Sequence, residues 1–95
     1  MRLDQFLRAS RLTLRRTVAQ EMCEAGAVEV NGAASRSSRT VRAGDEISLR
    51  RRDRLLTVRV NALPGTRNVS KDEASTLYEI VRDERIDDEE DALSV

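Results

Sequence analysis

The sequence predicts an α+β fold, in which two N-terminal helices pack on a small antiparallel sheet and one further helix lies near the C-terminus. Two N-terminal segments carry apolar residues at helical spacing. A short alternating segment then leads into Asn31-Gly32, a dipeptide that favours a tight hairpin turn. Two later segments alternate in the same way and supply partner strands. Ninety-five residues form one small domain.

The first predicted helix covers residues 2–9. Its two sides differ in character, with Leu3, Phe6 and Leu7 on one side and Arg2, Gln5 and Arg8 toward the other. Asp4 lies in the first turn, where a carboxylate complements the positive end of the helix dipole. We therefore expect Asp4 to stabilise the helix, with a secondary role in steering Arg2 or Arg8.

The second predicted helix starts after Thr13, a residue type suited to the N-cap, and ends at Gly26, which easily adopts the left-handed conformation. A helical wheel groups its apolar residues on one face: Leu14, Val18, Met22 and Ala25, flanked by Ala19 and Cys23. Arg16 and Gln20 fall opposite this face, so Arg16 is predicted to face away from the core. Arg15 lies nearer the apolar edge and could extend along the core.

The predicted sheet begins with residues 28–30, and the Asn31-Gly32 turn requires positive φ at both residues. The return strand starts at Ala33. Two further strands present their apolar residues inward, Ile47 and Leu49 in one and Leu56, Val58 and Val60 in the other. Residues 50–54, four arginines and one aspartate, are predicted to be a charged connector between them.

The C-terminal part combines a predicted helix with an acidic end. Residues 70–73 have the form of a capping box and precede Ala74, Leu77 and Val81 at helical spacing, which predicts a helix at about residues 71–85. Residues 87–91 are five consecutive acids, so we expect a disordered tail over residues 87–95.

Charge is distributed unevenly although the formal net charge is zero. Residues 1–70 carry fourteen arginines and seven acidic residues, whereas residues 71–95 carry three basic and ten acidic residues. The first sixteen residues hold five arginines and one acid. Such a density of guanidinium groups is typical of a surface that binds a phosphate backbone.

Composition argues against several classes of protein. No apolar run approaches the length of a signal sequence or a membrane span, and the single Cys23 predicts a reduced, cytoplasmic protein. Histidine is absent, and the sequence has no Gly-rich phosphate loop and no paired metal ligands, so we expect a binding protein without catalytic residues, metal or cofactor. Only Phe6 and Tyr78 are aromatic, which favours RNA recognised by shape and phosphate contacts over base stacking.

The order of these motifs resembles the RNA-binding domain named after the small-subunit ribosomal protein S-four. The resemblance covers about residues 1–62 and is carried by these segments: Arg2-Leu3-Asp4, Ser10-Arg11, Arg15-Arg16, Gly26, Val30-Asn31-Gly32 and Val41-Arg42-Ala43-Gly44-Asp45. It implies three parts, an S-four-like domain at 1–62, a C-terminal extension with a helix at 63–86 and the acidic tail at 87–95.

Over most of its length, including residues 57–63 and 74–84, the chain is similar to the RqcP family of bacterial ribosome-associated quality-control factors. That resemblance implies binding to large ribosomal subunits that still carry peptidyl-tRNA, contacts with rRNA and tRNA, and support of an RqcH-type partner that adds an alanine tail. The heat-shock S-four proteins are an alternative, but they carry a longer basic C-terminal extension, whereas this chain ends acidic. A protein-interaction module is a further alternative, because the late helix carries apolar residues on more than one face.

The predicted RNA-binding residues are Arg2, Arg8, Arg11, Arg15, Arg16, Gln20, Asn31, Arg36 and Arg39. Arg2 and Arg16 are the strongest candidates, whereas Asn31 has a structural alternative as a turn residue. Arg36, Arg39, Arg42 and residues 50–54 could extend the basic surface or protect strand edges from aggregation. We expect a monomer with neither a membrane contact nor a small-molecule substrate.

Overall fold

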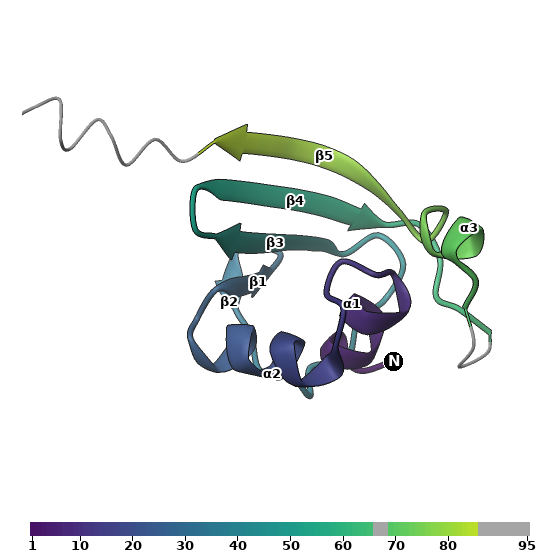
Figure 1. Cartoon of the computed structure of the whole chain (residues 1–95), viewed down its shortest axis with the longest axis horizontal. Coiled ribbons are helices and arrows are strands. Elements are labelled where there is room, and N and C mark those ends of the chain that lie inside the picture. Colours follow the sequence, from purple (N-terminus) through teal and green to yellow (C-terminus); the bar gives the residue numbers. More distant parts are fainter. Residues whose placement is uncertain (66–68, 86–95) are drawn as a thin grey trace, which may run out of the picture.

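The computed structural model describes residues 1–65 and 69–85 and contains a helical layer on one face of a sheet (Figure 1). The elements follow one another as α1 (Leu3–Ala9), α2 (Arg16–Glu24), β1 (Val28–Val30), β2 (Ala33–Ala34), β3 (Glu46–Arg51), β4 (Arg54–Val60), α3 (Lys71–Ala74) and β5 (Tyr78–Arg85). The five strands form one sheet in the order β2-β1-β3-β4-β5, and every neighbouring pair is antiparallel. The α+β prediction is confirmed.

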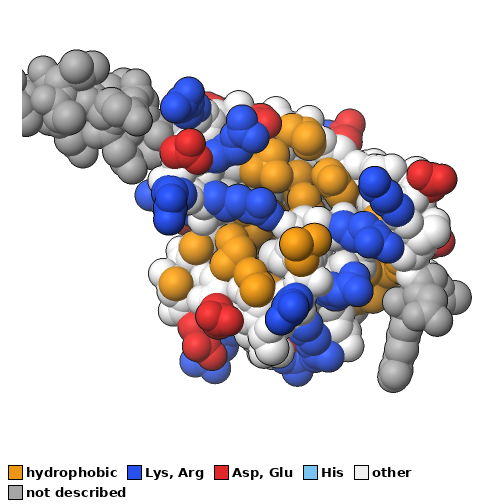
Figure 2. Space-filling model, in the orientation of Figure 1, with side chains coloured by type: hydrophobic (Ala, Val, Ile, Leu, Met, Phe, Trp, Pro, Cys, Tyr) orange, Lys and Arg blue, Asp and Glu red, His pale blue; other side chains and the backbone are white. Residues whose placement is uncertain are grey.

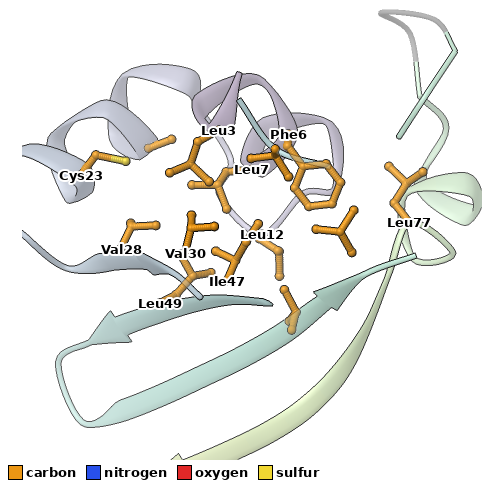
Figure 3. Close-up of a cluster of buried hydrophobic side chains, with 14 residues drawn as sticks. Leu3, Phe6, Leu7, Leu12, Cys23, Val28, Val30, Ile47, Leu49 and Leu77 are labelled. Atoms are coloured by element: carbon orange, nitrogen blue, oxygen red, sulfur yellow. The ribbon is translucent and has the colours of Figure 1, made fainter. Parts of the chain in front are cut away.

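The core lies between the two N-terminal helices and the sheet. Figure 3 shows side chains from α1 lying over apolar side chains of the strands, and Leu77 joining them from beyond α3. Leu3, Phe6 and Leu7 are buried as predicted. The strand residues that face them are also buried: Val28, Val30, Ile47, Leu49, Val58 and Val60. Leu56, also predicted to face inward, is partly buried and packs against this core, so the two strand periodicities identified the inward face correctly.

The turn at Asn31-Gly32 is confirmed by its backbone. Asn31 has φ 53° and Gly32 has φ 86°, the left-handed values that a two-residue hairpin of this type requires. Val30 pairs with Ala33 across it. The second hairpin is tighter than predicted, because Arg51 pairs with Arg54 and only residues 52–53 form the turn.

The second helix starts later than predicted. Its N-cap is Arg15, and the Thr13 hydroxyl donates instead to the Arg15 carbonyl oxygen at 3.3 Å. Leu14 precedes the helix and is 82% exposed. The predicted apolar face is wrong, because Val18 is also 40% exposed, whereas Ala19 and Cys23, which were placed at its flanks, are buried. The small residues allow α2 to approach α1 closely.

The late helix is much shorter than predicted. Ser70 caps it as expected, with its hydroxyl oxygen accepting a hydrogen bond from the Glu73 backbone at 3.1 Å, but α3 ends at Ala74. Residues 78–85, which had been assigned to that helix, form β5, which pairs along all of β4 with a bulge between Thr57 and Val58. The long β4 would otherwise present an unpaired edge, and pairing satisfies its backbone groups. The predicted tail at 87–95 lies outside the described residues.

Candidate nucleic-acid interface

Asp4 lies at the centre of a cluster of polar side chains from both N-terminal helices. Its carboxylate is completely buried, although it belongs to the most basic part of the chain. One oxygen, Oδ1, accepts hydrogen bonds from Arg2 Nε at 3.1 Å and from the backbone N–H of Gln5 at 2.8 Å. Arg2 Nη2 reaches the other oxygen at 3.3 Å. Asp4 therefore accepts a hydrogen bond from a backbone N–H in the first turn of α1 and also holds the Arg2 side chain in place. These contacts correspond to both of the roles predicted for Asp4.

The second helix contributes two more donors to the same carboxylate. Arg16 Nε lies 3.0 Å and Gln20 Nε2 lies 2.9 Å from Asp4 Oδ2. Arg16 begins α2 and Gln20 follows one turn later, so both side chains lie on the same side of the helix. Arg16 is exposed, as predicted for a residue that faces away from the core, but its side chain also reaches the junction between α1 and α2, where Gln20 joins it. The Asp4 cluster, defined here as Arg2, Asp4, Arg16 and Gln20, joins the helices.

The cluster determines the protonation of its carboxylate. Burial would raise the pKa of Asp4, but hydrogen bonds from Gln20, Arg2 and Arg16 outweigh this effect and lower it from 3.8 to about 2. Asp4 is therefore ionised at neutral pH. One carboxylate faces two guanidinium groups, so the cluster keeps an excess positive charge.

Arg2 and Arg16 remain accessible while they are held. Each side chain is 44% exposed. The bond from Arg16 to Asp4 uses Nε, and neither of its two Nη groups makes a hydrogen bond within the described residues. A guanidinium group oriented in this way can donate to a phosphate.

Three more predicted arginines lie around the cluster. Arg8 and Arg16 are among the residues that line a hollow of about 570 Å³ beside α1. Arg36 and Arg39 are exposed and lie on a segment that runs alongside the N-terminus of the chain. The Leu3 backbone N–H donates to the Arg39 carbonyl oxygen at 2.8 Å, and Arg2 and Thr40 pair in an isolated antiparallel β-bridge. The fold thus brings residues from three separate segments to one region.

Arg11 and Arg15 lie in the connection between the two helices. Arg15 is exposed at the N-cap of α2, so it does not extend along the core. Arg11 has φ 61°, a left-handed conformation that costs an arginine about 1 kcal/mol. Its Nη2 reaches the Val69 carbonyl oxygen at 3.4 Å.

Asn31 lies apart from the Asp4 cluster, and its side chain is engaged within the fold. Its Nδ2 donates to Asp45 Oδ1 at 3.2 Å, and its Oδ1 accepts from the Glu46 backbone at 3.0 Å. These bonds tie the first hairpin to the start of β3. They agree with the alternative interpretation of Asn31 as a structural residue of the turn.

Comparison with known proteins assigns the chain to a family. The S4 domain matches residues 1–47. The RQC P-site tRNA stabilizing factor of Halalkalibacterium halodurans is 46% identical over 86 residues, which cover 90% of this chain and 96% of the relative. The factor of the same name from Bacillus subtilis is 42% identical, covering 90% and 98%. The chain belongs to this family.

Solved structures agree with the RQC P-site tRNA stabilizing factor assignment at the level of the fold. Heat shock protein 15 of Vibrio cholerae, described as trimeric, superposes with a TM-score of 0.77 and 32% identity, over 85% of this chain and 81% of that one. The solution structure of a hypothetical protein gives 0.75 and 33% identity, over 88% and 100%. Both likenesses extend past the matched S4 domain.

The described residues contain no group of three or more potential metal ligands. None of the helices in ranges 1–65 and 69–85 is long and apolar enough to cross a lipid bilayer. The functional residue that sequence reasoning undervalued is Asp4. A lone acid among five arginines is the signal that could have identified it, because a buried carboxylate needs several donors and these were the donors nearby.

Proposed function

We propose that this protein is a non-enzymatic RNA-binding factor of ribosome-associated quality control. In this proposal it binds rRNA and peptidyl-tRNA on large ribosomal subunits that have split after stalling, and it supports C-terminal alanine tailing by an RqcH-type partner. It acts in the cytoplasm, as a monomer. The name shared by the relatives, RQC P-site tRNA stabilizing factor, supports the tRNA and ribosome part of this proposal.

The observation that carries the proposal is the Asp4 cluster. The buried carboxylate orients Arg2 and Arg16 beside one another, and both side chains stay accessible to a phosphate. A structured RNA presents phosphates at fixed spacing, so arginines held in place lose little conformational entropy when they bind it. Arg8, Arg11, Arg15, Arg36 and Arg39 extend this surface, and Gln20 and Asn31 act mainly by positioning their neighbours.

The scarcity of accessible aromatic rings favours structured RNA as the ligand. Phe6 is completely buried in the core and Tyr78 is half-buried at the start of β5. Unpaired bases bind most single-strand readers by stacking on exposed rings. Contacts to the phosphates of folded rRNA and tRNA need no such rings.

Two measurements test this function. Tagged protein is followed through sucrose gradients of cell lysate, where we expect enrichment on large subunits that carry peptidyl-tRNA and scarcity on translating ribosomes. Arg16→Ala and Arg2→Ala should each reduce this enrichment about tenfold, since one charge-assisted hydrogen bond contributes about 1.5–3 kcal/mol. Arg82→Ala, an exposed arginine of β5, is the matched control and should behave as wild type. Equal distribution over all ribosomal fractions would contradict the proposal.

A second candidate is the function of the heat shock protein 15 relatives. The Escherichia coli protein of that name is 38% identical over 79 residues, covering 83% of this chain and 59% of the relative. Alanine tails on stalled nascent chains distinguish the two. Loss of the tails when this protein is deleted supports the quality-control function, whereas unchanged tails together with binding to large subunits support the heat-shock type.

A further inference from the structure

A second surface, separate from the Asp4 cluster, combines exposed apolar side chains with arginines. It is a groove of about 660 Å³ between the connection of the two helices, the side of α2 and the end of β3. The residues that line it are Arg11, Leu12, Thr13, Leu14, Val18, Met22, Arg50 and Arg51. We call it the Leu14 groove.

The apolar part of the groove is unusually accessible. Leu14 is 82% exposed and Val18 is 40% exposed, and Met22 is only half-buried beside them. Figure 2 shows apolar side chains gathered between basic side chains on the face that it presents. Covering such side chains with another apolar group would contribute about 25 cal/mol for each Å² removed from water.

The rim of the groove is positively charged. Three of the residues that line the groove are arginines, and no lining residue is acidic. Arg51 donates to the Leu12 carbonyl oxygen, which fixes its guanidinium group at the edge of the groove. An occupant that suits this surface carries carboxylates beside a few apolar side chains.

The described chain ends close to this groove. Arg85, the last residue of β5, pairs with Arg54, and Arg54 pairs with Arg51. Adjacent strands lie about 4.8 Å apart, so the backbone at Arg85 is about 10 Å from that at Arg51. Figure 1 shows the end of β5 beside the turn between β3 and β4.

Residues 86–95 follow Arg85 and lie outside the described part of the chain. Their sequence carries the acids Asp87, Asp88, Glu89, Glu90 and Asp91 and then the apolar residues Leu93 and Val95. Ten extended residues span about 30 Å, three times the backbone separation between Arg85 and Arg51 at the rim of the groove. The sequence therefore supplies carboxylates and apolar side chains in an order that matches the arginine rim and the apolar floor.

We propose that the C-terminal segment 86–95 of the same chain occupies the Leu14 groove, with Leu93 and Val95 on Leu14 and Val18 and the acidic run against the arginine rim. Tethering gives the segment an effective concentration in the millimolar range, so an attraction with a dissociation constant of about the same size keeps it bound for about half of the time. The segment shields an apolar patch and competes with RNA for Arg11, Arg50 and Arg51. The contact between the segment and the groove does not require RNA, although Arg11 belongs both to this groove and to the RNA-binding surface proposed above.

Methyl NMR spectra of the full-length chain test the proposal without RNA. The variant Leu93→Ser/Val95→Ser should shift the methyl signals of Leu14, Val18 and Met22 and leave the core signals of Leu3 unchanged. Ser94→Ala, a change in the same segment that removes no apolar side chain, is the matched control and should give the wild-type spectrum. In a Leu14→Ser background, which is tolerated because that side chain is exposed, the tail substitutions should shift Val18 and Met22 much less.

High salt should reduce the difference between wild type and Leu93→Ser/Val95→Ser, because the acidic run loses its attraction to the rim. Identical groove signals in these two proteins would overturn the proposal. Signals that change with protein concentration would also overturn it, because they would identify a second copy as the occupant. If the groove signals respond to added RNA but not to the tail substitutions, the occupant of the groove is RNA and not the C-terminal segment, and the proposal is overturned.

Discussion

Asp4→Asn is the substitution that most directly tests the role of the Asp4 cluster. The amide keeps the size of the side chain but removes its charge and replaces an acceptor oxygen with a donor. Arg2, Arg16 and Gln20 all donate to this carboxylate, so the variant places a donor where they need an acceptor. The two helices then lose part of what joins them.

The size of the effect follows from the pKa of Asp4. The cluster lowers it from 3.8 to about 2, a difference that corresponds to about 2.5 kcal/mol in the free energy of unfolding. A carboxyl group whose pKa is lower in the folded protein stabilises the fold above its unfolded pKa, and this contribution disappears as the pH falls through the folded pKa. The contribution is therefore about 2.5 kcal/mol at neutral pH, about 1.3 at pH 3 and below about 0.5 at pH 2.

Urea unfolding followed by circular dichroism, on wild type and Asp4→Asn across this pH range, measures the difference. Other carboxylates titrate in both proteins, so only the gap between the two free energies of unfolding reports on Asp4. The neutral-pH gap should lower the melting temperature of the variant by about 10–20 °C in a domain of this size. A gap that stays constant from pH 7 to pH 2 would refute the reasoning, because it would show that the charge of Asp4 contributes nothing.

Three further substitutions or reactions test other features. Gly32→Val should destabilise the protein by about 1–2 kcal/mol in urea unfolding, because φ is 86° at this position; a Cβ would meet no atom within 4 Å, so the cost comes from the backbone alone. Gly32→Asn is the control and should be tolerated. Equal stability of wild type and both variants would contradict the positive-φ turn at this position. Arg11→Gly should raise the free energy of unfolding by about 0.5–1 kcal/mol by relieving the left-handed backbone, while RNA binding weakens. Cys23 is buried and burial raises the pKa of its thiol, so iodoacetamide should modify it at least about tenfold more slowly than free cysteine until the protein unfolds; rapid modification would show that α2 opens.

The sheet was the part of the fold that local signals predicted best. A strand repeats every two residues, so Ile47, Leu49, Val58 and Val60 could be assigned to the inward face from alternation alone. The turn at Asn31-Gly32 is equally local, because its positive φ values depend on the residue types themselves. Such features need no knowledge of distant contacts.

Two errors, in the apolar face of the second helix and in the length of the late helix, have a common physical origin. Leu14 and Val18 looked like core residues, and Leu77 and Val81 looked like one face of a helix, because apolar spacing does not reveal which side chains find a partner. The N-terminus of α2 and the strand β5 depend on tertiary contacts, which override weak local propensity. For β5 the decisive contact is the edge of β4, and no local signal in residues 78–85 announces that edge.

The RNA affinity of Asp4→Asn tests whether the Asp4 cluster orients Arg2 and Arg16 for binding in addition to stabilising the fold. If only charge mattered, Asp4→Asn would remove the buried negative charge beneath Arg2 and Arg16 and should strengthen binding to a phosphate backbone. If Asp4 acts instead by orienting Arg2 and Arg16, its loss frees both side chains to adopt many rotamers. RNA binding must then order each side chain again, at a cost of about 0.5–1.5 kcal/mol each. The two effects have opposite signs, so the RNA affinity of Asp4→Asn under conditions where it is folded separates them. Weaker binding means that the protein uses folding energy to prearrange its RNA contacts, and stronger binding means that Asp4 serves the fold alone.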